Sequence, residues 1–403
     1  IGLGYVGVPV ALRFARCFDV VGYDMDARRI EKLREKYGAG CGSIRFTSLE
    51  EELSRAAFYI VTVLTPVDER KNPDLTCLVE ATRTVARYLK RGDYVVYEST
   101  VYPGCTEEVC VPLLEKGSGL KLGADFKVGY SPERINPNDS EHTFSNTAKI
   151  VSANDGQALD EVARVYAEVV AADLCRASGI RVAEAAKMTE NVQRSVNIAL
   201  MNELQRLFSR MGIDMGEVID MASSKWNFVK YRPGLGGGHC IPVDPLYLVS
   251  AASKLGVEMP VTSSGCAVND GMAAYVVRSL LGAMGSDGRG ARALLMGVTY
   301  KENIDDIRNS RIAEMVGLLE REGMSVDVTD PHADPDKVYA MYGIRPVPAL
   351  RPPYDLIVVA VAHDEYRGLD DAYFRSISRG AALLGDIRGL YKGRIKSLGY
   401  WSL

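Results

Sequence analysis

The sequence contains few of the residues and patterns that accompany metal sites or disulfide frameworks. Its 403 residues include four histidines, which lie far apart, and none of its eight cysteines forms a C-x-x-C pair. Structural zinc sites normally bring Cys and His together at short, regular spacings. A chain of this length also buries enough apolar surface to be stable without disulfides. We therefore expect no bound metal, and we expect most cysteines to be reduced core residues.

A strong excess of charge and long apolar runs are also absent. The formal net charge is −4, and the Lys and Arg residues form no basic stripe of the kind that binds a phosphate backbone. No apolar run reaches the roughly 18 residues of a membrane-spanning helix, and no signal-peptide pattern is visible. These absences predict a cytoplasmic protein that binds neither nucleic acid nor a membrane. The chain opens inside a motif, at Ile1, and we expect its natural start to lie upstream.

Apolar β-rich segments alternate with helical patterns at both ends of the chain. Strands are expected at 20–23, 58–63, 94–97, 293–297, 325–328 and 356–361. This rhythm is typical of βαβ units in a parallel sheet. Between the two regions, apolar residues recur at helical spacing from about residue 177 to Arg210, and a Gly-rich stretch at 282–290 is typical of a linker.

The sequence thus predicts an α/β protein with two Rossmann-like doubly wound parallel-sheet domains joined by a long central helix. At roughly 150 residues per domain, the length also favours two or three domains. The expected boundaries are 1–178 for the first domain, 179–283 for the central helical segment and 284–403 for the last domain.

A glycine fingerprint opens the chain. Gly2, Gly4 and Gly7 fit the pattern G-x-G-x-x-G, and Asp24 ends the next strand, about 20 residues further on. Such glycines let the backbone turn tightly against a pyrophosphate at a helix N-terminus, while the carboxylate accepts hydrogen bonds from ribose hydroxyls. Since a carboxylate repels a 2′-phosphate, the pattern indicates NAD rather than NADP. Ordinary turn glycines are the alternative interpretation.

Two polar segments follow later strands of the same domain. Thr65 comes after the second expected strand and Thr100 after the third. Ligands bind at the carboxyl edge of parallel sheets, so both threonines are candidate ligand contacts. Simple strand-ending turn chemistry is the alternative.

The stretch from Pro233 to Pro245 combines four glycines with a cysteine, Cys240, that follows them directly. The glycines let the backbone pass close to a ligand. A cysteine just before the helix expected at 246–252 would have its thiolate favoured by the helix dipole, which activates a nucleophile. Asp244, four residues on, is placed to act as a base or to orient a water. A buried cysteine beside a glycine turn is the alternative.

The long helical pattern carries Lys187 and Asn191 at positions i and i+4, so both project from one face. A lysine and an amide aimed at one point can stabilise an oxyanion. Taken alone, such a pair is more often a solvated helix face.

Together these residues resemble a known family. The chain is similar to the UDP-glucose/UDP-mannose dehydrogenase family from Gly2 to about Arg388. The motifs that carry the resemblance are GxGYVG at 2–7, Asp24, Thr-Pro at 65–66, Glu-Ser-Thr at 98–100, YSPER at 130–134, AEAAK at 183–187 with Asn191, GGHC at 237–240 with Asp244, and Tyr-Lys at 300–301 with Asp-Ile-Arg at 306–308.

The resemblance implies a role for each of these positions. The NAD site would comprise Gly2, Gly4, Gly7, Asp24, Thr65, Thr100 and Arg308. The UDP-sugar would be bound by Glu133, Arg134, Lys187, Gly237 and Lys301. Catalysis would involve Cys240, Lys187, Asn191, Asp244, Glu133 and Thr100. The family resemblance also implies a homodimer with the long central helix at its interface.

Variants within these motifs, including SPERINP at 131–137 and KWNF at 225–228, resemble the branch that acts on UDP-N-acetylglucosamine or UDP-N-acetylgalactosamine. Such enzymes supply uronic acids to capsule or O-antigen polysaccharide synthesis. The implied reaction is a four-electron oxidation of the C6 alcohol to a carboxylate, through a thiohemiacetal and a thioester on Cys240. Asp244 or Glu133 would activate the hydrolytic water.

Several alternatives remain open at this point. The substrate could be UDP-N-acetylmannosamine or UDP-glucose, since no motif fixes the sugar. A two-electron dehydrogenase of the hydroxyacid type could share the N-terminal fold and the long helix, and it needs no thiol. A protein that only binds a nucleotide sugar is a third possibility.

Overall fold

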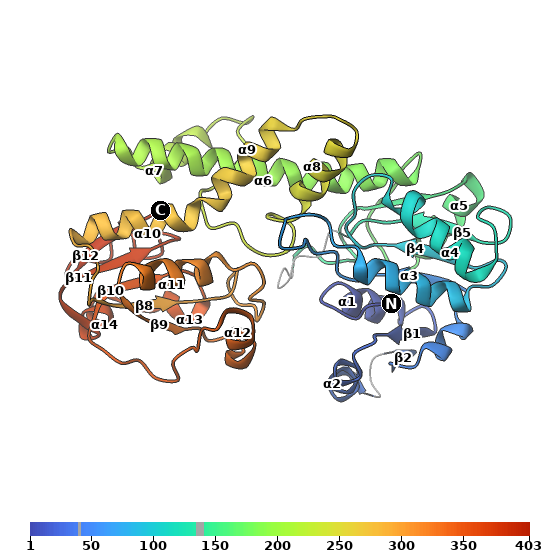
Figure 1. Ribbon diagram of the computed structural model, residues 1–403, viewed down its shortest axis with the longest axis horizontal. Helices are drawn as coiled ribbons and strands as arrows, with labels where there is room; N and C mark the ends of the chain where they lie inside the picture. Colours follow the sequence, from blue (N-terminus) through green and yellow to red (C-terminus); the bar gives the residue numbers. More distant parts are fainter. Residues whose placement is uncertain (39–41, 134–140) are drawn as a thin grey trace. The chain divides into compact units, whose positions relative to one another are not determined.

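The structure is a computed structural model that describes residues 1–38, 42–133 and 141–403 (Figure 1). By its internal contacts the chain divides into two compact units. Unit 1 comprises Ile1–Asn191 and Leu246–Glu258, and unit 2 comprises Val192–Pro245 and Met259–Leu403. The division falls inside the long helix α6 (Ile180–Arg210), whose existence and length the helical pattern had predicted. The three-segment boundaries at 178 and 283 stay a prediction.

Unit 1 alternates helices and strands along the chain. Its elements are α1 (Gly7–Phe14), β1 (Val20–Tyr23), α2 (Ala27–Tyr37), β2 (Ile44–Thr47), η2 (Glu50–Arg55), β3 (Phe58–Val61), α3 (Thr76–Tyr88), β4 (Tyr94–Tyr97), η3 (Thr106–Cys110), α4 (Val111–Ser118), β5 (Lys127–Tyr130), β6 (Lys149–Ala153), α5 (Gly156–Ala167), β7 (Leu174–Arg176), the first part of α6, and most of α8 (Asp244–Lys254).

The first residues of the chain connect two groups of strands in unit 1 by backbone hydrogen bonds. One set of strands has the order β3-β4-β5-β6-β7, and β1 pairs with β2 in parallel. Ile1 exchanges backbone hydrogen bonds with the β3 side, donating to Ile60 and accepting from Thr62, while the Gly2 N–H donates to Tyr23 at the end of β1. Ile1 and Gly2 therefore lie between β1 and β3 and give the order expected of a Rossmann-like sheet.

One pair in this sheet departs from the expected parallel arrangement. β3, β4 and β5 run parallel, but β5 and β6 pair antiparallel. Parallel neighbours require a crossover connection, usually a helix. The described residues between β5 and β6, 131–133 and 141–148, contain no helix. The predicted parallel-sheet fold therefore contains one local departure, the antiparallel pair of β5 and β6.

The sheet of unit 1 is buried on both faces. Val95 and Val96 in β4 are both fully buried, although neighbouring strand residues point to opposite faces. Val96 packs in a cluster with residues of α1 and α5, such as Phe14 and Tyr166. Helices α3 and α4 pack against each other in the same unit (Figure 1). Coverage of both faces is the arrangement expected of a doubly wound sheet.

Unit 2 contains a second sheet of the same kind. Its elements are the remainder of α6, α7 (Met215–Ala222), the start of α8, α9 (Pro260–Asp270), α10 (Met272–Met284), β8 (Arg292–Met296), α11 (Arg311–Arg321), β9 (Ser325–Thr329), α12 (Pro335–Tyr342), β10 (Tyr354–Val359), α13 (Asp364–Arg367), α14 (Asp371–Ser376), β11 (Ser378–Asp386) and β12 (Gly399–Ser402).

The sheet of unit 2 is parallel throughout its described strands, in the order β12-β11-β10-β8-β9. Alternate residues of β8 enter two different cores. Ala293 and Leu295 pack with α10 and α11, whereas Leu294 and Met296 pack with Phe374 of α14. Unit 2 therefore confirms the predicted doubly wound parallel sheet.

Polar caps determine where several helices begin. The Asp26 carboxylate accepts hydrogen bonds from the backbone of Arg28 and Arg29 at the start of α2, at 3.0 and 3.3 Å. Ser310 caps α11 in the same way through the Ile312 N–H. Each such cap stabilises its helix by about 1 kcal/mol.

The predicted linker at 282–290 begins later than expected. Helix α10 continues through Gly282 to Met284, and the chain turns at Gly285, which adopts a left-handed φ of 66°. Leu281 and Met284 pack against the core of unit 2 and hold the last turn of this helix. Tertiary packing therefore outweighs the low helix propensity of Gly282.

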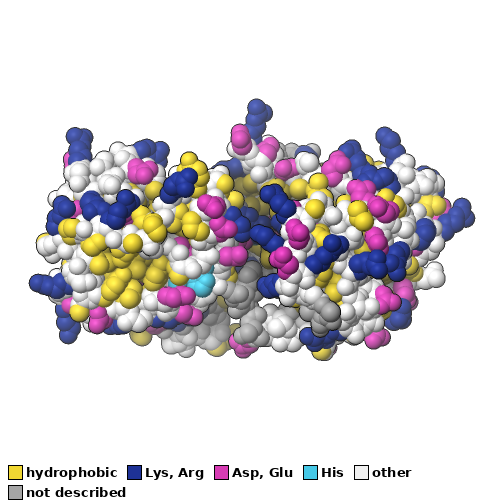
Figure 2. Space-filling model, turned by 90° about the horizontal axis from the view of Figure 1, so that it is seen from below, with side chains coloured by type: hydrophobic (Ala, Val, Ile, Leu, Met, Phe, Trp, Pro, Cys, Tyr) yellow, Lys and Arg dark blue, Asp and Glu magenta, His cyan; other side chains and the backbone are white. Residues whose placement is uncertain are grey.

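The surface seen in Figure 2 carries Lys and Arg side chains interspersed with Asp and Glu side chains. No described helix combines the length and the apolar character that crossing a membrane requires.

Candidate active site

The glycine fingerprint of unit 1 forms a tight turn at the carboxyl edge of the sheet. Asp24 directly follows β1, and its Oδ2 accepts a hydrogen bond of 2.8 Å from the Leu3 N–H. The second carboxylate oxygen accepts from the Asp26 N–H at 3.0 Å. Asp24 therefore links the glycine turn to the end of the next strand, and its side chain is largely buried.

The glycine turn has the steric features of a dinucleotide cradle. A Cβ on Gly7 would lie 1.9 Å from the Gly2 carbonyl oxygen, so a larger residue is excluded there. Gly2 has a φ of 87°. By contrast, nothing lies within 4 Å of a Cβ on Gly4. The turn thus packs closely on its protein side and is open beside Gly4, which fits a pyrophosphate at the start of α1.

Three further predicted residues follow successive parallel strands of unit 1. Thr65 comes after β3, Thr100 after β4 and Glu133 after β5. The carboxyl ends of parallel strands lie at one edge of a sheet, so these residues share that edge. The Ser99 hydroxyl donates to the Val63 carbonyl at 2.7 Å and ties two of these segments together. The predicted substrate residue Arg134 lies outside the described residues.

Lys187 and Asn191 lie on a buried face of α6. Lys187 is 6% exposed and Asn191 is 0% exposed, so the interpretation as a solvated face does not hold. The Lys187 Nζ donates a hydrogen bond to the Glu133 carbonyl oxygen. The structure therefore brings Lys187 and Glu133 together at the carboxyl edge of unit 1.

A buried ion pair that the sequence did not single out lies next to this edge. Lys149 Nζ is 3.3 Å from Glu98 Oε2, and neither side chain is more than 4% exposed. Lys149 also donates to the Pro132 carbonyl at 3.2 Å, and the Tyr166 hydroxyl donates to Glu98 Oε1. Glu98 belongs to the Glu98-Ser99-Thr100 segment, and that neighbourhood is the signal that could have identified it.

In unit 2, Cys240 occupies the turn that leads into α8. Its carbonyl oxygen accepts from the Val243 and Asp244 N–H groups, at 3.3 and 3.0 Å, and α8 begins at Asp244. The predicted position of Cys240 just before a helix N-terminus is therefore confirmed. Cys240 is half-buried, whereas Asp244 is only 2% exposed.

The glycines before Cys240 pass close to protein rather than to open space. A Cβ on Gly237 would lie 2.8 Å from the Asn309 carbonyl oxygen and 2.9 Å from Tyr300 Cβ. Gly238, with a φ of 83°, would place a Cβ 2.7 Å from the Tyr300 ring. The Asn309 amide also donates to the Gly238 carbonyl at 3.0 Å. The glycine loop that precedes Cys240 is thus docked on the segment that joins β8 to α11.

His239 adds a charged contact to this docking. Its Nε2 lies 3.1 Å from Asp306 Oδ2, and Arg308 binds the same carboxylate through Nε at 2.9 Å and Nη2 at 2.6 Å. Burial alone would raise the pKa of Asp306, but the hydrogen bonds from His239 and Arg308 hold it well below its ordinary value. Asp306 is therefore an anion that joins Arg308 to the residue preceding Cys240.

The same burial affects Tyr300. Desolvation, followed by the electrostatic influence of Asp306 and then of Cys240, raises the pKa of Tyr300 to about 12. Tyr300 therefore stays a neutral phenol beside the glycines that precede the thiol.

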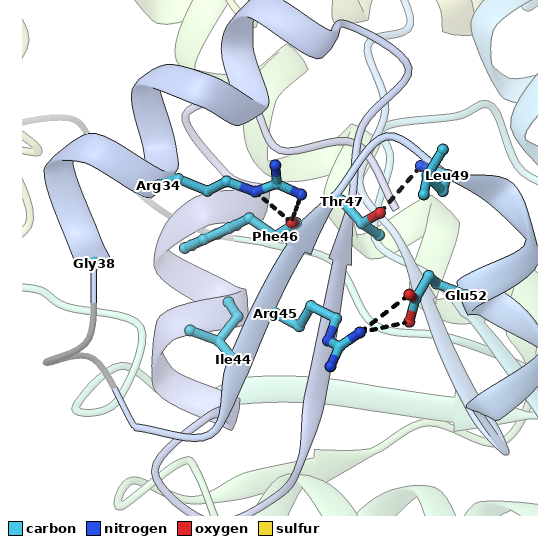
Figure 3. Close-up of a pocket in the computed structure, with 8 residues that line it drawn as sticks. All are labelled: Arg34, Gly38, Ile44, Arg45, Phe46, Thr47, Leu49 and Glu52. Carbon is cyan, nitrogen blue, oxygen red and sulfur yellow. Dashed lines mark hydrogen bonds and ion pairs between the residues drawn. The ribbon is translucent and has the colours of Figure 1, made fainter.

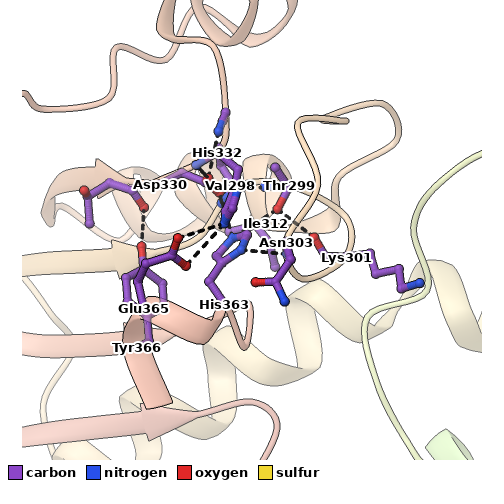
Figure 4. Close-up of polar contacts among 12 residues, drawn as sticks. Val298, Thr299, Lys301, Asn303, Ile312, Asp330, His332, His363, Glu365 and Tyr366 are labelled. Atoms are coloured by element: carbon purple, nitrogen blue, oxygen red, sulfur yellow. Dashed lines mark hydrogen bonds and ion pairs between the residues drawn. The ribbon is translucent and has the colours of Figure 1, made fainter. Parts of the chain in front are cut away.

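The start of the β8–α11 segment is held by a second carboxylate, Asp330, which follows β9. Its Oδ2 accepts from the Val298 and Thr299 N–H groups at 2.6 and 3.1 Å and from His363 Nε2 at 3.3 Å. Burial alone would raise the pKa of Asp330, but these partners hold it well below its ordinary value. Figure 4 shows the predicted substrate residue Lys301 next in this segment, with its side chain directed away from His363.

Three residues near Asp330 have the types that a metal ion prefers. Candidate ligand atoms of His332, His363 and Glu365 lie within 4.8 Å of one another. However, His363 Nδ1 accepts from the Asn303 N–H at 2.9 Å, which places the ring proton on Nε2. Nε2 donates that proton toward Asp330 and Thr299 (Figure 4). Neither nitrogen of His363 is therefore available as a ligand in this arrangement.

Two surface cavities lie one in each unit. One, of about 460 Å³, lies at the β2 edge of unit 1 (Figure 3). In its wall, Arg34 donates hydrogen bonds to the Phe46 carbonyl, and Arg45 donates to the Glu52 carboxylate. The other, of about 550 Å³, is lined in unit 2 by residues 345–351 and Pro335. Neither cavity is lined by a residue of the predicted NAD, substrate or catalytic sets.

The glycine turn, the acidic residue after β1 and the doubly wound sheets define the class of dinucleotide-dependent dehydrogenases. Family models match the chain in three consecutive parts. They are described as the NAD binding domain (residues 37–170), the central domain (181–271) and the UDP binding domain (294–393) of the UDP-glucose/GDP-mannose dehydrogenase family.

Known proteins are similar over nearly the whole chain. The chain is 45% identical to UDP-N-acetyl-D-glucosamine 6-dehydrogenase from Pseudomonas aeruginosa, covering 97% of this chain and 96% of that protein. It is 43% identical to the protein of the same name from Salmonella typhi, with 96% and 95% covered. The solved structure of UDP-D-ManNAc dehydrogenase from Pyrococcus horikoshii has a TM-score of 0.90 at 29% identity, covering 100% of this chain and 97% of that one.

The chain belongs to the UDP-glucose/GDP-mannose dehydrogenase family. The family's name pairs UDP-glucose with GDP-mannose rather than with UDP-mannose. The protein is an NAD-dependent oxidoreductase of the UDP-sugar dehydrogenase class, as the resemblance predicted.

Proposed function

We propose that this protein is a UDP-N-acetylglucosamine 6-dehydrogenase that oxidises the C6 alcohol of its substrate to a carboxylate. The two relatives of that name, each more than 40% identical over nearly their full lengths, support the sugar. UDP-N-acetylgalactosamine, which differs at C4, belongs to the same proposal, and UDP-N-acetylmannosamine and UDP-glucose are the alternatives.

One observation carries the proposed chemistry: a half-buried cysteine lies one turn before a helix, in a loop that is docked on the segment carrying Tyr300, Lys301 and Arg308. A two-electron dehydrogenase needs no thiol. A thiol whose thiolate is favoured by the N-terminal end of α8 is suited to attack an aldehyde. This position supports a covalent, four-electron mechanism over the hydroxyacid-type alternative.

In the proposed mechanism, NAD would supply the hydride acceptor, with one NAD molecule used in each of the two oxidation steps. After the alcohol has become an aldehyde, the Cys240 sulfur bonds to its carbon and forms a thiohemiacetal. Oxidation of that adduct gives a thioester, and water then displaces the sulfur and releases the acid. The protons of the alcohol, the adduct and the water pass to protein bases and solvent.

The buried face of α6 supplies the proposed oxyanion stabilisation. Lys187 offers a positive charge and Asn191 an amide, and their burial strengthens the electrostatic effect of both. Glu133 and Thr100, after neighbouring strands of the same sheet, are proposed to orient the reacting hydroxyl and transfer its proton. Asp244 or Glu133 is proposed to activate the hydrolytic water.

The remaining residues are proposed to bind the two nucleotides. Gly2, Gly4, Gly7, Asp24, Thr65, Thr100 and Arg308 form the proposed NAD site. Glu133, Arg134, Lys187, Gly237 and Lys301 form the proposed UDP-sugar site. The tight turn at Gly7 and the open space beside Gly4 support the first set, and the docking of Gly237 beside the segment of Lys301 supports the second.

The protein is also proposed to act as a cytoplasmic homodimer. Leu200 and Leu207 are seven residues apart on α6 and are 48% and 52% exposed, and Met211, which directly follows the helix, is 59% exposed. An exposed apolar stripe along a helix is typical of an association surface. The product, a nucleotide-linked uronic acid, suits capsule or O-antigen polysaccharide synthesis.

A substrate panel tests the proposed sugar. Purified protein is incubated with NAD and UDP-N-acetylglucosamine, UDP-N-acetylgalactosamine, UDP-N-acetylmannosamine or UDP-glucose, and initial rates of NADH formation are compared as kcat/KM. We expect the highest value for UDP-N-acetylglucosamine, followed by its C4 epimer. A higher value for UDP-N-acetylmannosamine or UDP-glucose would replace the proposed substrate with that sugar.

A further inference from the structure

Unit 1 buries a pair of opposite charges that the proposed mechanism does not use. The Glu98 and Lys149 side chains are 0% and 4% exposed, with Lys149 Nζ 3.3 Å from Glu98 Oε2. Aromatic rings enclose them, since Lys149 Nζ lies 4.9 Å from the Phe144 ring centre and 5.4 Å from that of Tyr166. Burial, and then the charge of Glu98, raises the pKa of Tyr166 well above its ordinary value, so Tyr166 stays a hydrogen-bond donor to this carboxylate.

Such a pair is a costly way to fill space. Desolvation of two buried ions often outweighs their attraction, and well-packed apolar residues frequently give equal or higher stability. The aromatic surroundings of Lys149 would accept an apolar side chain. The feature that an apolar residue could not reproduce is the hydrogen bond from Lys149 Nζ to the Pro132 carbonyl, at 3.2 Å.

That hydrogen bond acts on the segment that carries Glu133. Residues 131–133 leave β5 without entering a helix or strand, so side chains must fix their conformation. Ser131 is held by its N–H to the Tyr97 carbonyl and by its hydroxyl to the Ile150 carbonyl. The next two carbonyls are each held by a buried lysine, Pro132 by Lys149 and Glu133 by Lys187.

We propose that Glu98 and Lys149 are positioning residues, whose ion pair holds the backbone at 131–133 so that Glu133 and Lys187 keep the geometry that oxidation requires. This inference rests on the proposed roles of Glu133 and Lys187. Neither Glu98 nor Lys149 contacts the sugar in this account. Their effect passes through the Pro132 carbonyl.

The test separates folding from positioning. Lys149→Met leaves the Glu98 carboxylate buried without its cation, and we expect a lower melting temperature and a lower kcat. Adding Glu98→Gln to this variant removes the negative charge of the carboxylate that has lost its cation. We expect this double variant to regain most of the melting temperature while kcat stays roughly 10–100-fold below wild type, because small displacements of reacting groups are costly. The KM for NAD should change less than about twofold, since the glycine turn is untouched.

Lys127→Met is the matched control. Lys127 begins the same strand, β5, and also binds one carboxylate and one carbonyl, those of Asp155 and Gly123. It lies at the opposite end of the strand from Glu133, so we expect its kcat to equal that of wild type. An equal loss of kcat in Lys127→Met would show a general effect of lysine removal and would overturn the positioning role.

A double-mutant cycle identifies the route of the effect. In a Lys187→Ala background, the Glu98→Gln/Lys149→Met change should lower the residual kcat by a clearly smaller factor than in the wild-type background, because the part of its effect that depends on the Lys187 contact with Glu133 is already lost. Full additivity, or a wild-type kcat in the double variant, would overturn the inference.

Two further outcomes keep the test decisive. If the double variant does not fold, Tyr166→Phe takes its place, because it removes a hydrogen bond to Glu98 and keeps both charges of the ion pair. A several-fold lower kcat in Tyr166→Phe supports the inference. An unchanged kcat overturns it. Loss of activity in Lys187→Ala with normal activity in every Glu98, Lys149 and Tyr166 variant overturns the positioning role alone. A wild-type protein that forms no NADH with any UDP-sugar overturns the proposed function and this inference with it.

Discussion

His239 Nε2 lies 3.1 Å from Asp306 Oδ2, and this contact ties the residue before Cys240 to the segment between β8 and α11. Arg308, a proposed NAD ligand, binds the same carboxylate. One anion thus links a proposed cofactor contact to the loop of the proposed nucleophile. The position of Cys240 in unit 2 depends on this carboxylate as well as on the glycines around Tyr300.

The first prediction concerns the stability that Asp306 contributes. Asp306→Asn should lower the free energy of unfolding at pH 7 by about 1–3 kcal/mol, because it weakens hydrogen bonds to two partners. The folded-state pKa of Asp306 lies below its ordinary value of 3.8. Its contribution is therefore fully present above that pH and is lost as the pH falls through the lower, folded-state value. Urea unfolding of wild type and variant between pH 7 and pH 3 measures the difference.

The neighbouring exposed carboxylate, Asp305, provides the control. Asp305→Asn should leave the unfolding free energy within about 0.5 kcal/mol of wild type at each pH, as expected for a surface site. A difference in unfolding free energy between wild type and Asp306→Asn that increases as the pH falls would contradict the predicted loss of the Asp306 contribution in acid.

The second prediction concerns Cys240. Cys240→Ser should lower kcat for acid formation by at least about 1000-fold, because a hydroxyl is a much weaker nucleophile at this position. The melting temperature should stay close to that of wild type, since the side chain is half-buried and nearly unchanged in size. Calorimetry should show retained UDP-sugar binding.

Cys266→Ser is the matched control for Cys240. Cys266 is also half-buried, in α9, and has no proposed role. Its kcat should equal that of wild type. Equal losses in the two variants would argue against a specific nucleophile at Cys240.

The third prediction concerns cofactor choice. Asp24→Ala should raise the KM for NAD by on the order of tenfold, the equivalent of one lost hydrogen bond, and should reduce the preference for NAD over NADP. Initial rates with both cofactors measure the change. Asp26→Asn, at the cap of α2, should leave the KM for NAD and the preference unchanged. An unaltered NAD/NADP ratio in Asp24→Ala would exclude the ribose contact.

The fourth prediction concerns association. Leu200→Glu together with Leu207→Glu should convert a homodimer into monomers in light scattering, because charges on the exposed stripe of α6 would have to be buried. Leu255→Glu is the control for a general effect of adding surface charge, since Leu255 lies outside α6 and is 81% exposed. It should leave the dimer intact. Persistence of the dimer in the double variant would move the interface elsewhere.

Local sequence patterns predicted much of the fold. The strand at 94–97 matches β4, and the apolar periodicity gave α6 because 31 residues of continuous helical spacing leave little ambiguity. The antiparallel return of β6 was missed, since a strand's own sequence does not specify the direction of its partner. The extension of α10 through Gly282 was missed because its packing partners lie far away in the sequence.

The candidate site was also predictable only where local sequence patterns mark its residues. The glycine fingerprint and the cysteine loop have local signatures, so their residues could be named. The close neighbours of Gly237 and Gly238 are Tyr300 and Asn309, although the glycines alone suggested only a nearby ligand. Contacts such as His239 to Asp306, or Lys149 to Glu98, join residues more than 50 positions apart, and no local pattern marks them.

The most direct test of the four-electron mechanism is the amount of NADH formed per UDP-N-acetylglucosamine consumed. With limiting sugar and excess NAD, absorbance at the NADH band and chromatography of the sugar nucleotide give the ratio. A thioester route through Cys240 predicts about two NADH per sugar and a carboxylate product. One NADH per sugar, with an aldehyde or ketone as the product, would contradict it.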